Sequence, residues 1–416
     1  MENPKIRFKG FTKDWEQRKL GELVKEGILE APLDGNHGEK HPTSDEYVDS
    51  GIPFLMASDI HNGEVNIYSC KYITKERAER LDKGFARNGD VLLTHKATIG
   101  ETAILSNLMT EYAMLTPQVT YYRIKNEERL NREYLYSFFN SLDFQTELKT
   151  KAAQSTRPYI GITAQQNLKI ILPAEIDEQI RIGLYFRNLD HLITLHQRKC
   201  EQTKKLKKYM LQKMFPRNGA KVPEIRFDGF TYDWEQRRFG EITELKSASR
   251  VHKDEWTSNG VPFYRSSDVM TAINGTENEK AFISEELYEK LSKVSGKLEE
   301  GDILVTGGGS VGNPYIVPDN KPLYTKDADL LWIKNKGKFH PYFLYEFFFS
   351  PTFRNYLGSI SHVGTIAHYT ITQLSDTPIG LPIFEEQKEV GEYFQSLDRL
   401  ITLHQRQHKL HLNTLL

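Results

Sequence analysis

The most explicit chemical motif of the chain is a glycine-rich stretch at residues 307–312 (GGGSVG), which follows a β-branched run. Its spaced glycines match the G-x-G-x-x-G fingerprint of a dinucleotide site, and Ser310 lies in the G-x-S-x-G pattern of a hydrolase nucleophile. Pro314, however, stands where the helix of a dinucleotide site should begin. A matching stretch at 95–100 (HKATIG) has lost two of the three glycines and the serine. We therefore expect neither a dinucleotide nor a catalytic serine here.

Other catalytic motifs are incomplete. Residues 313–315 (NPY) approach the Asn-Pro-Pro-aromatic tetrapeptide of amino-methyltransferases but lack the second proline, and no cofactor-binding βαβ unit accompanies them. Residues 147–149 (ELK) lack an upstream aspartate suited to a nuclease centre, and no Walker lysine motif is present. The sequence therefore predicts no catalytic residue and a protein that is not itself an enzyme.

Cysteine and histidine patterns argue against a metal or a disulfide. Cys70 and Cys200 are far apart and have no histidine or cysteine at ligand spacing. Three histidines fall at helical spacing within 404–411, but one of them matches His196 in an earlier copy of the same segment. This repetition favours polar positions on a helix seam or surface, so no metal is predicted.

Composition limits the class of protein. The chain has 416 residues, 21 Tyr and 22 Phe, enough bulky side chains for two separate cores. Its charged N-terminus and the absence of a long apolar run favour a cytoplasmic protein with no membrane partner. The net charge is −1, but DNA binding depends on the local cations that meet phosphates. The lysines of 204–208 (KKLKK) favour a solvated helix face over a binding site.

An internal duplication organises the chain. Four segments of the N-terminal half recur in the same order in the C-terminal half. The pairs are 4–23 with 223–242, 51–60 with 260–269, 88–100 with 300–312, and 189–198 with 397–406. Two copies are too few for a solenoid, so each copy should be a domain with its own core. The stretches 34–41 and 247–255 differ between the copies, which suits a fixed scaffold with variable loops.

Within each copy the pattern is that of an α/β (α+β) domain followed by a long helix. Apolar and β-branched runs at 51–55, 91–94, 119–124, 303–306 and 330–333 predict strands. Helices are expected at 75–83, 133–141, 285–293 and 342–349.

The long helices should begin near Ile176 and Phe384, each after a Leu-Pro pair, and the first should run to Phe215. Apolar residues three and four apart predict that they pair as an antiparallel coiled coil with a pseudo-two-fold relation. The expected organisation is 1–175 first domain, 176–216 central helix, 217–222 linker, 223–383 second domain and 384–416 C-terminal helix.

The tandem arrangement resembles the specificity (S) subunits of type I restriction-modification systems over nearly the whole chain. Those proteins open each recognition domain with an RF…W…LGE-type segment and each helix with L-D-x-L-I. The matching residues here are Arg7, Phe8, Trp15 and Gly21 with Arg226, Phe227, Trp234 and Gly240, then 189–193 with 397–401. Only ten residues follow Arg406, whereas seventeen separate Arg198 from Phe215, so the two helices could contact partners unequally.

The resemblance implies a non-catalytic subunit that reads a bipartite site in double-stranded DNA. Two methyltransferase (M) subunits would bind the helices, and two restriction/motor (R) subunits would complete the complex. S-adenosylmethionine, ATP and Mg would belong to those partners, with no cofactor in this chain. The helix positions implied as partner-binding are Leu189, Leu192, Ile193, Leu397, Leu400 and Ile401.

Candidate DNA contacts come from physical reasoning on the loops. Two strand-and-loop elements combine hydroxyls, a lysine and bare backbone amides suited to phosphates: Thr94, Lys96, Thr98 and Gly100, with Thr306, Gly308, Ser310 and Gly312. A tight turn between strands is an equally good interpretation of them. Base reading needs residues that differ between the copies, and the candidates are Gln154, Arg157, Tyr159, Arg265, His362 and His368.

Three other functions fit less well. A specificity chain for a different methyltransferase-nuclease complex would need the same two domains and helices, and only its partners would differ. A stand-alone DNA-modifying enzyme would need the motifs that are missing here. A structural adaptor would have no affinity for DNA at any salt concentration.

Overall fold

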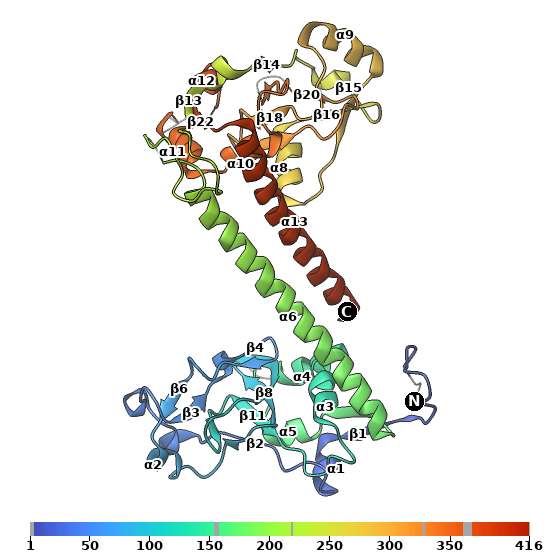
Figure 1. Cartoon of the computed structure of the whole chain (residues 1–416). Coiled ribbons are helices and arrows are strands. Elements are labelled where there is room, and N and C mark those ends of the chain that lie inside the picture. The colour runs from blue at the N-terminus through green and yellow to red at the C-terminus, as the bar shows by residue number, and fades with distance from the viewer. Residues whose placement is uncertain (1–3, 154–157, 218, 327–328, 361–367, 416) are drawn as a thin grey trace. The chain divides into compact units, whose positions relative to one another are not determined.

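The computed structural model describes residues 4–153, 158–217, 219–326, 329–360 and 368–415. The chain divides into two compact units: the N-terminal unit, residues 1–195 with 410–416, and the C-terminal unit, residues 196–409. Two long helices, α6 (Ile176–Lys213) and α13 (Phe384–Leu415), contribute residues to both units. Figure 1 shows each of them as one uninterrupted helix.

The N-terminal unit is built from small sheets, coloured blue to cyan in Figure 1. One four-stranded sheet has the order β2 (Leu33–Asp34), β11 (Val119–Tyr122), β8 (Val91–Lys96) and β9 (Thr98–Ile104). A second has the order β6 (Lys71–Ile73), β3 (Ile52–Leu55), β10 (Ala113–Leu115) and β7 (Phe85–Ala86). Strand β1 (Trp15–Lys19) pairs antiparallel with β12 (Lys169–Pro173), and a short hairpin joins β4 (Ile60–His61) and β5 (Glu64–Val65).

The C-terminal unit repeats this plan. Its sheets have the orders β14 (Leu245–Ser247), β21 (Leu330–Ile333), β18 (Ile303–Thr306), β19 (Pro314–Ile316), and β15 (Trp256–Thr257), β17 (Ala281–Ile283), β16 (Val261–Tyr264), β20 (Tyr324–Thr325). Strand β13 (Glu235–Arg238) pairs with β22 (Pro378–Leu381) as β1 does with β12. Both units also place one parallel pair among antiparallel strands, β3 with β10 and β16 with β20. The duplicated α/β domain and the five predicted strands are confirmed.

Short helices cover these sheets. The N-terminal unit has α1 (Leu20–Lys25), α2 (Lys75–Ala78), α3 (Arg132–Phe139), α4 (Leu142–Ala152) and α5 (Ile162–Gln166). The C-terminal unit has α7 (Phe239–Ile242), α8 (Ser266–Asn274), α9 (Glu285–Ser295), α10 (Pro341–Phe347), α11 (Pro351–Ile360) and α12 (Ile371–Asp376).

Helix α2 is shorter than the predicted 75–83. The Asn36 side chain accepts a hydrogen bond from the Asp82 backbone N–H and donates one to the Lys83 carbonyl, so these two backbone groups bond outside a helix. Gly84 then takes a positive φ of 91°, which turns the chain into β7.

The opening segment of each copy, residues 4–23 and 223–242, binds the first turn of the long helix of that copy through an ion pair. Arg7 makes a bidentate ion pair with Glu178 in the first turn of α6, at 2.6 and 2.7 Å, and Arg226 does the same with Glu386 of α13, at 2.7 Å for both bonds. Each glutamate side chain is almost fully buried, so its partner arginine is needed to offset desolvation. The arginine of the RF…W motif is therefore structural in both copies.

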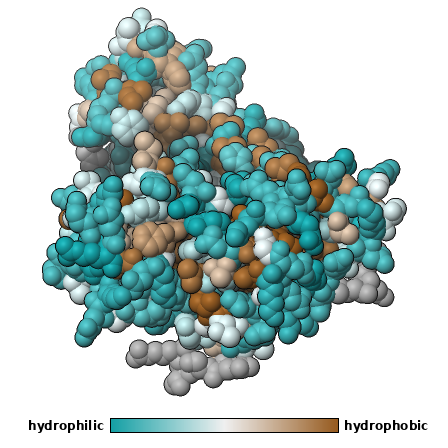
Figure 2. Space-filling view, turned by 90° about the horizontal axis from the view of Figure 1, so that it is seen from below, coloured by the Kyte–Doolittle hydropathy of each residue, from teal (hydrophilic) through white to brown (hydrophobic). Residues whose placement is uncertain are grey.

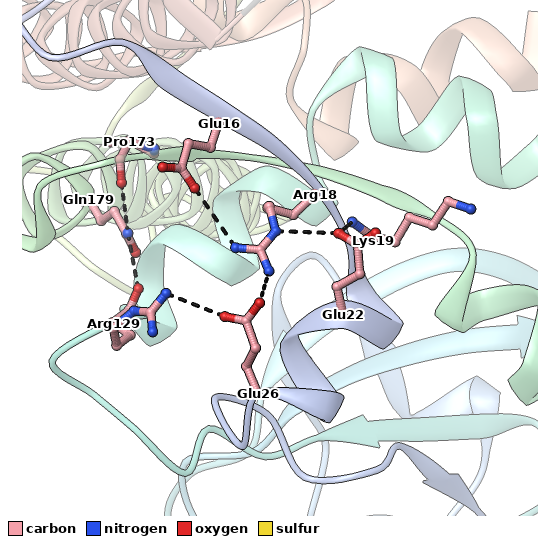
Figure 3. Close-up of polar contacts among 8 residues, drawn as sticks. All are labelled: Glu16, Arg18, Lys19, Glu22, Glu26, Arg129, Pro173 and Gln179. Carbon is pink, nitrogen blue, oxygen red and sulfur yellow. Dashed lines mark hydrogen bonds and ion pairs between the residues drawn. The ribbon is translucent and has the colours of Figure 1, made fainter.

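A glutamine beside each glutamate completes the fastening. Gln179 donates to the carbonyls of Pro173 and Arg129, at 3.0 and 3.2 Å (Figure 3). Gln387 likewise donates to the Pro382 carbonyl at 2.9 Å. Figure 3 also shows Arg18 among Glu16, Glu22 and Glu26, a network that holds β1 against α1.

Within the C-terminal unit, α6 and α13 run antiparallel. From the N-terminal toward the C-terminal end of α6, His196 contacts His404, Cys200 Sγ lies 4.0 Å from the Ile401 carbonyl oxygen, and Lys207 binds Asp398. Because the partner numbers on α13 fall as those on α6 rise, the predicted antiparallel pairing is confirmed. His196 and His404 are equivalent residues of the two copies, so the pseudo-two-fold axis of the pair passes between them.

Helix α6 ends at Lys213, two residues before the predicted end at Phe215. Met214 and Phe215 leave the helix to enter the core of the C-terminal unit, where both are buried. Phe215 packs there against Trp234, Phe343 and Phe394. Pro216 has no backbone N–H and could not continue the helix.

Candidate nucleic-acid interface

The hairpin β8–β9 of the N-terminal unit and its counterpart β18–β19 share two positions of left-handed backbone in their connecting segments. Ala97 (φ 68°) and Gly309 (φ 73°) occupy equivalent positions, as do Gly100 (φ 95°) and Gly312 (φ 76°). The two hairpins thus bend at the same two positions, although β8 and β9 pair up to the turn and β18 and β19 are separated by residues 307–313. Only the N-terminal unit places a side chain, that of Ala97, at the first point.

A distant segment crosses each hairpin at the same place. In the N-terminal unit Tyr159 forms a β-bridge with Lys96, and the Ile160 N–H donates to the His95 carbonyl at 3.2 Å. In the C-terminal unit His368 forms the equivalent bridge with Gly308, and the Tyr369 N–H donates to the Gly307 carbonyl at 2.8 Å. Residues that sequence reasoning chose from two remote regions of each copy are therefore neighbours.

Thr94 and Thr306 lie inside the hairpins and are fully buried. The Thr94 hydroxyl accepts the Glu101 N–H at 3.0 Å, and the Thr306 hydroxyl accepts the Asn313 N–H at 2.9 Å. Thr306 also donates to the Ser310 carbonyl. These two threonines shape the hairpins and offer no hydroxyl to a phosphate in this structure.

Exposed side chains differ between the two hairpins. Lys96, Thr98 and Tyr159 are exposed in the N-terminal unit, where the Tyr159 ring lies 5.6 Å from that of His95. Ser310 and His368 are exposed in the C-terminal unit. A cation, hydroxyls and aromatic rings on a bare turn can contact phosphate oxygens and base edges.

Gly100, Gly308 and Gly312 serve the backbone of these hairpins. The Gly100 carbonyl accepts a hydrogen bond from the Gln145 side chain at 2.8 Å. Gly308 lies within the β-bridge to His368. A Cβ at Gly312 would come within 2.7 Å of Leu357, so this turn packs against α11.

Of the other residues predicted to contact bases, the structure describes only Arg265. Arg265 is bound to Asp268 at 2.9 Å, donates to the Glu279 carbonyl, and lies 5.5 Å from the centre of the Trp256 ring. Its guanidinium is thus engaged within the unit. Gln154, Arg157 and His362 lie outside the described residues.

The positive φ of Ala97 gives a stability prediction with a built-in comparison. An L-residue in the left-handed region costs about 1 kcal/mol, and nothing lies within 4 Å of the Cβ that Gly309 would gain. We expect Gly309→Ala to lower the free energy of unfolding by about 1 kcal/mol and Ala97→Gly to leave it unchanged or slightly raised. Urea denaturation of the full chain measures both, and destabilisation by Ala97→Gly beyond that of Gly309→Ala would contradict the assignment.

Sequence reasoning missed a polar cluster beside the first hairpin. Asp34 is buried at the end of β2 and accepts hydrogen bonds from Lys83 Nζ and, at 2.9 Å, from His37 Nε2. His95 Nε2, fully buried, lies 3.9 Å from Asp34 Oδ2. The only sequence signal was that residues 34–41 differ between the copies.

The surroundings shift the pKa values of Asp34 and His95 within this cluster. Burial raises the pKa of Asp34, but hydrogen bonds from Lys83 and His37 outweigh it and hold that pKa below its ordinary value. Burial lowers the pKa of His95 to about 4, so its imidazole is neutral. His95 Nδ1–H donates to the Ile160 carbonyl at 3.0 Å, which leaves Nε2 as a lone pair.

The helix positions predicted to bind partners are unequal in exposure. Leu189 and Leu397 are buried, Leu192, Ile193 and Ile401 are half-buried, and Leu400 is 44% exposed. Leu403, one turn further along α13, is also exposed. Leu400 and Leu403 therefore leave apolar side chains of α13 exposed.

The basic run 204–208 is not uniformly solvated. Lys207 lies 2.8 Å from Glu346 Oε1 and 2.7 Å from Asp398, and its side chain is mostly buried. The interpretation of the run as a plain solvated face is thus wrong for Lys207, because α10 and α13 of the same unit supply two carboxyl groups that sequence spacing does not show.

Among the described residues, no group of three or more histidine, cysteine or carboxylate side chains could hold a metal ion. No helix of the described chain is long and apolar enough to cross a membrane. Figure 2 shows one face of the molecule as mostly hydrophilic, with hydrophobic residues in separate patches.

Comparison with known proteins identifies the family. The family model described as Type I restriction modification DNA specificity domain matches residues 12–205 and 232–413. The MjaVIII type I restriction enzyme specificity subunit of Methanocaldococcus jannaschii is 23% identical over 95% of this chain and 88% of its own length. A putative MjaX specificity subunit from the same organism is 24% identical over 95% of this chain and 89% of its own length.

A solved structure has the same fold. The S subunit of a type I restriction-modification system from M. genitalium has a TM-score of 0.61 and 13% identity, and the match covers 100% of this chain and 97% of that one. Two similar α/β domains, each followed by a long helix, are the fold that the two structures share. This chain belongs to the type I restriction-modification specificity family and is a non-catalytic specificity subunit with two target-recognition domains.

Proposed function

We propose that the two units each read one half of a bipartite double-stranded DNA site through the hairpins β8–β9 and β18–β19. The observation that carries this proposal is that the same hairpin and β-bridge occur in both units but carry different exposed side chains. The bridge places Tyr159 beside Lys96 in one unit and His368 beside Gly308 in the other. A constant backbone with different side chains suits two readers of different bases.

The proposed division of labour follows from exposure. Lys96, Thr98 and Ser310 would meet phosphates, with the backbone amides around Gly100, Gly308 and Gly312. Tyr159 and His368, with Gln154, Arg157 and His362, would meet bases. Thr94 and Thr306 would act by holding the turns, and Arg265 by holding α8.

The proposed partners are two methyltransferase subunits on the long helices and two restriction/motor subunits. S-adenosylmethionine, ATP and Mg would bind those partners. The proposed domain limits are 1–175, 223–383 for the recognition domains, and 176–216, 384–416 for the helices, with the linker at 217–222. A cytoplasmic location would follow from such an assembly.

The direct test is reconstitution with a methyltransferase partner encoded beside this chain. The mixture should methylate DNA at one bipartite sequence, found by mapping modified adenines, while either protein alone should not. Methylation by the partner alone with the same sequence preference would contradict the proposal.

Lys96 provides a quantitative test of phosphate contact. Loss of one phosphate contact should lower the slope of log K against log salt by about 0.9 in magnitude and weaken specific and random duplexes by the same factor. We therefore expect Lys96→Ala to do both in the reconstituted complex, measured by fluorescence anisotropy from 50 to 200 mM salt. The control is Lys71→Ala, which removes an exposed lysine from the other sheet. An unchanged salt slope in Lys96→Ala would assign this lysine no phosphate contact.

A further inference from the structure

We propose that His37 is a base-reading residue of the N-terminal unit and that it accepts a hydrogen bond from the exocyclic amino group of an adenine or cytosine in the major groove. This inference rests on the proposed function. It assigns one residue, one atom and one class of base group to the first recognition domain.

The tautomer of His37 is fixed by its partner. The lowered pKa of Asp34 keeps this carboxylate ionised, so it can only accept hydrogen bonds. His37 Nε2 lies 2.9 Å from Asp34 Oδ2 and must therefore carry the proton. The proposal concerns His37 in its neutral form, in which a proton on Nε2 leaves Nδ1 without one, and Nδ1 is then an acceptor.

The support beneath His37 is rigid. The Asp34 side chain is only 3% exposed, and its other oxygen is bound by Lys83. Asn36, also buried, holds the backbone of residues 82 and 83 through both ends of its amide. His95 presents a lone pair and no proton to Asp34, so it cannot replace His37 as the donor to Oδ2.

Position and exposure suit His37 for contact with DNA. Its side chain is 50% exposed, although Asp34 is buried. The chain of contacts from His37 through Asp34 to His95 and then to the Tyr159 ring joins it to the hairpin β8–β9. These contacts connect His37, whose side chain is half exposed, with the hairpin that carries Lys96 and Tyr159.

An acceptor atom held in a fixed direction, such as His37 Nδ1, favours bases that present a hydrogen-bond donor to it. In the major groove the amino groups of adenine and cytosine are the hydrogen-bond donors, whereas guanine and thymine offer acceptors there. A fixed Nδ1 lone pair accordingly favours adenine or cytosine and disfavours guanine or thymine at one base pair. In the C-terminal unit Ser247 stands at the strand position of Asp34, so this arrangement is special to the first half-site.

The test uses the reconstituted complex and duplexes in which single amino groups are removed from the mapped first half-site, with purine in place of adenine and 2-pyrimidinone in place of cytosine. One such removal should weaken binding to the parent complex about 5- to 10-fold, the effect of one good hydrogen bond. His37→Ala should weaken binding to the intact duplex by a similar factor. The same removal should have no further effect on His37→Ala, while removals at other positions keep theirs.

His252→Ala is the matched control, because His252 is an exposed histidine of the second variable segment. It should leave every amino-group effect in the first half-site unchanged. Asp34→Asn adds a second arm: its amide can donate to Nε2, which frees the other tautomer and should reduce the preference for the amino group about 5-fold or more.

The outcomes separate this inference from the proposed function. Additive effects of His37→Ala and every amino-group removal would overturn the reading role, as would coupling only to the minor-groove amino group of guanine, tested with inosine. A parent complex that shows no sequence preference at all would instead overturn the proposed function.

Discussion

Glu346→Gln is expected to make the chain more stable than the parent at pH 8.5, with an advantage that shrinks as the pH is lowered to 6. Glu346 of α10 is fully buried, and its Oε2 has no hydrogen-bond partner among the described residues. Burial raises the pKa of this carboxyl to about 8, and Lys207 only partly opposes that effect. The Lys207 contact at 2.8 Å fits this state, since a neutral carboxyl still offers a carbonyl oxygen.

The direction of the pH effect follows from linkage. In the unfolded chain a glutamate loses its proton near pH 4.3, whereas in the folded chain Glu346 keeps it to about pH 8. The stability due to proton binding is therefore full below the unfolded pKa and is lost as pH rises through the folded pKa. Each pH unit in that interval costs about 1 kcal/mol.

Thermal or urea unfolding of both chains between pH 6 and 9 measures this difference directly. The stability of Glu346→Gln relative to the parent should grow by about 2 kcal/mol from pH 6 to pH 8 and then level off. Glu389→Gln, an exposed glutamate on α13, should show no such growth. A stability difference that is constant with pH would mean that Glu346 is ionised throughout and pairs with Lys207 as a charge.

Sequence periodicity predicted the strands and long helices of this molecule because the signals for them lie close together in the sequence and occur in both copies. The strand at 303–306 and the helices starting at Ile176 and Phe384 follow from apolar runs and helix stops that lie within a few residues of one another. Duplication then fixed the correspondence between the copies, which the matching φ values at Ala97 and Gly309 confirm.

Long-range polar contacts were beyond the reach of sequence reasoning. Nothing in the spacing shows that Lys207 meets Glu346, 139 positions away, or that Lys83 meets Asp34. The threonines at 94 and 306 are a related case. Their hydroxyls suggested phosphate contacts, yet each accepts a backbone N–H seven residues on, because a hydroxyl inside a hairpin must be satisfied there.

Exchange of residues 223–383 for the same region of another specificity subunit is expected to replace one half of the recognised sequence and keep the other. The C-terminal unit has its own hydrophobic core, including Trp234, Phe343 and Phe394, and the N-terminal unit has a separate one around Tyr122 and Phe139. The two cores share no residue, but Phe215 and Phe394 lie outside 223–383, so a foreign domain must pack on these retained side chains as well. The junctions are Val222 before the opening segment and Ile383 before α13.

The expected change is large. Each wrong base pair costs about 1–3 kcal/mol, so three or four new bases shift the preference between old and new sites by 1,000-fold or more. Mapping of methylated adenines after reconstitution reads both halves at once. The parent chain and an exchange with a close variant of the same domain serve as controls for assembly.

The decisive comparison is between the two halves of the mapped site. Retention of the first half with a new second half would show that the units read independently and that 223–383 carries the whole of one specificity. Alteration of both halves by this single exchange would contradict independent reading, since no residue of the first hairpin or of the His37 cluster is touched. Reciprocal exchange of 1–175 should then move the His37-dependent amino-group preference together with the first half-site, which ties that preference to the domain that contains it.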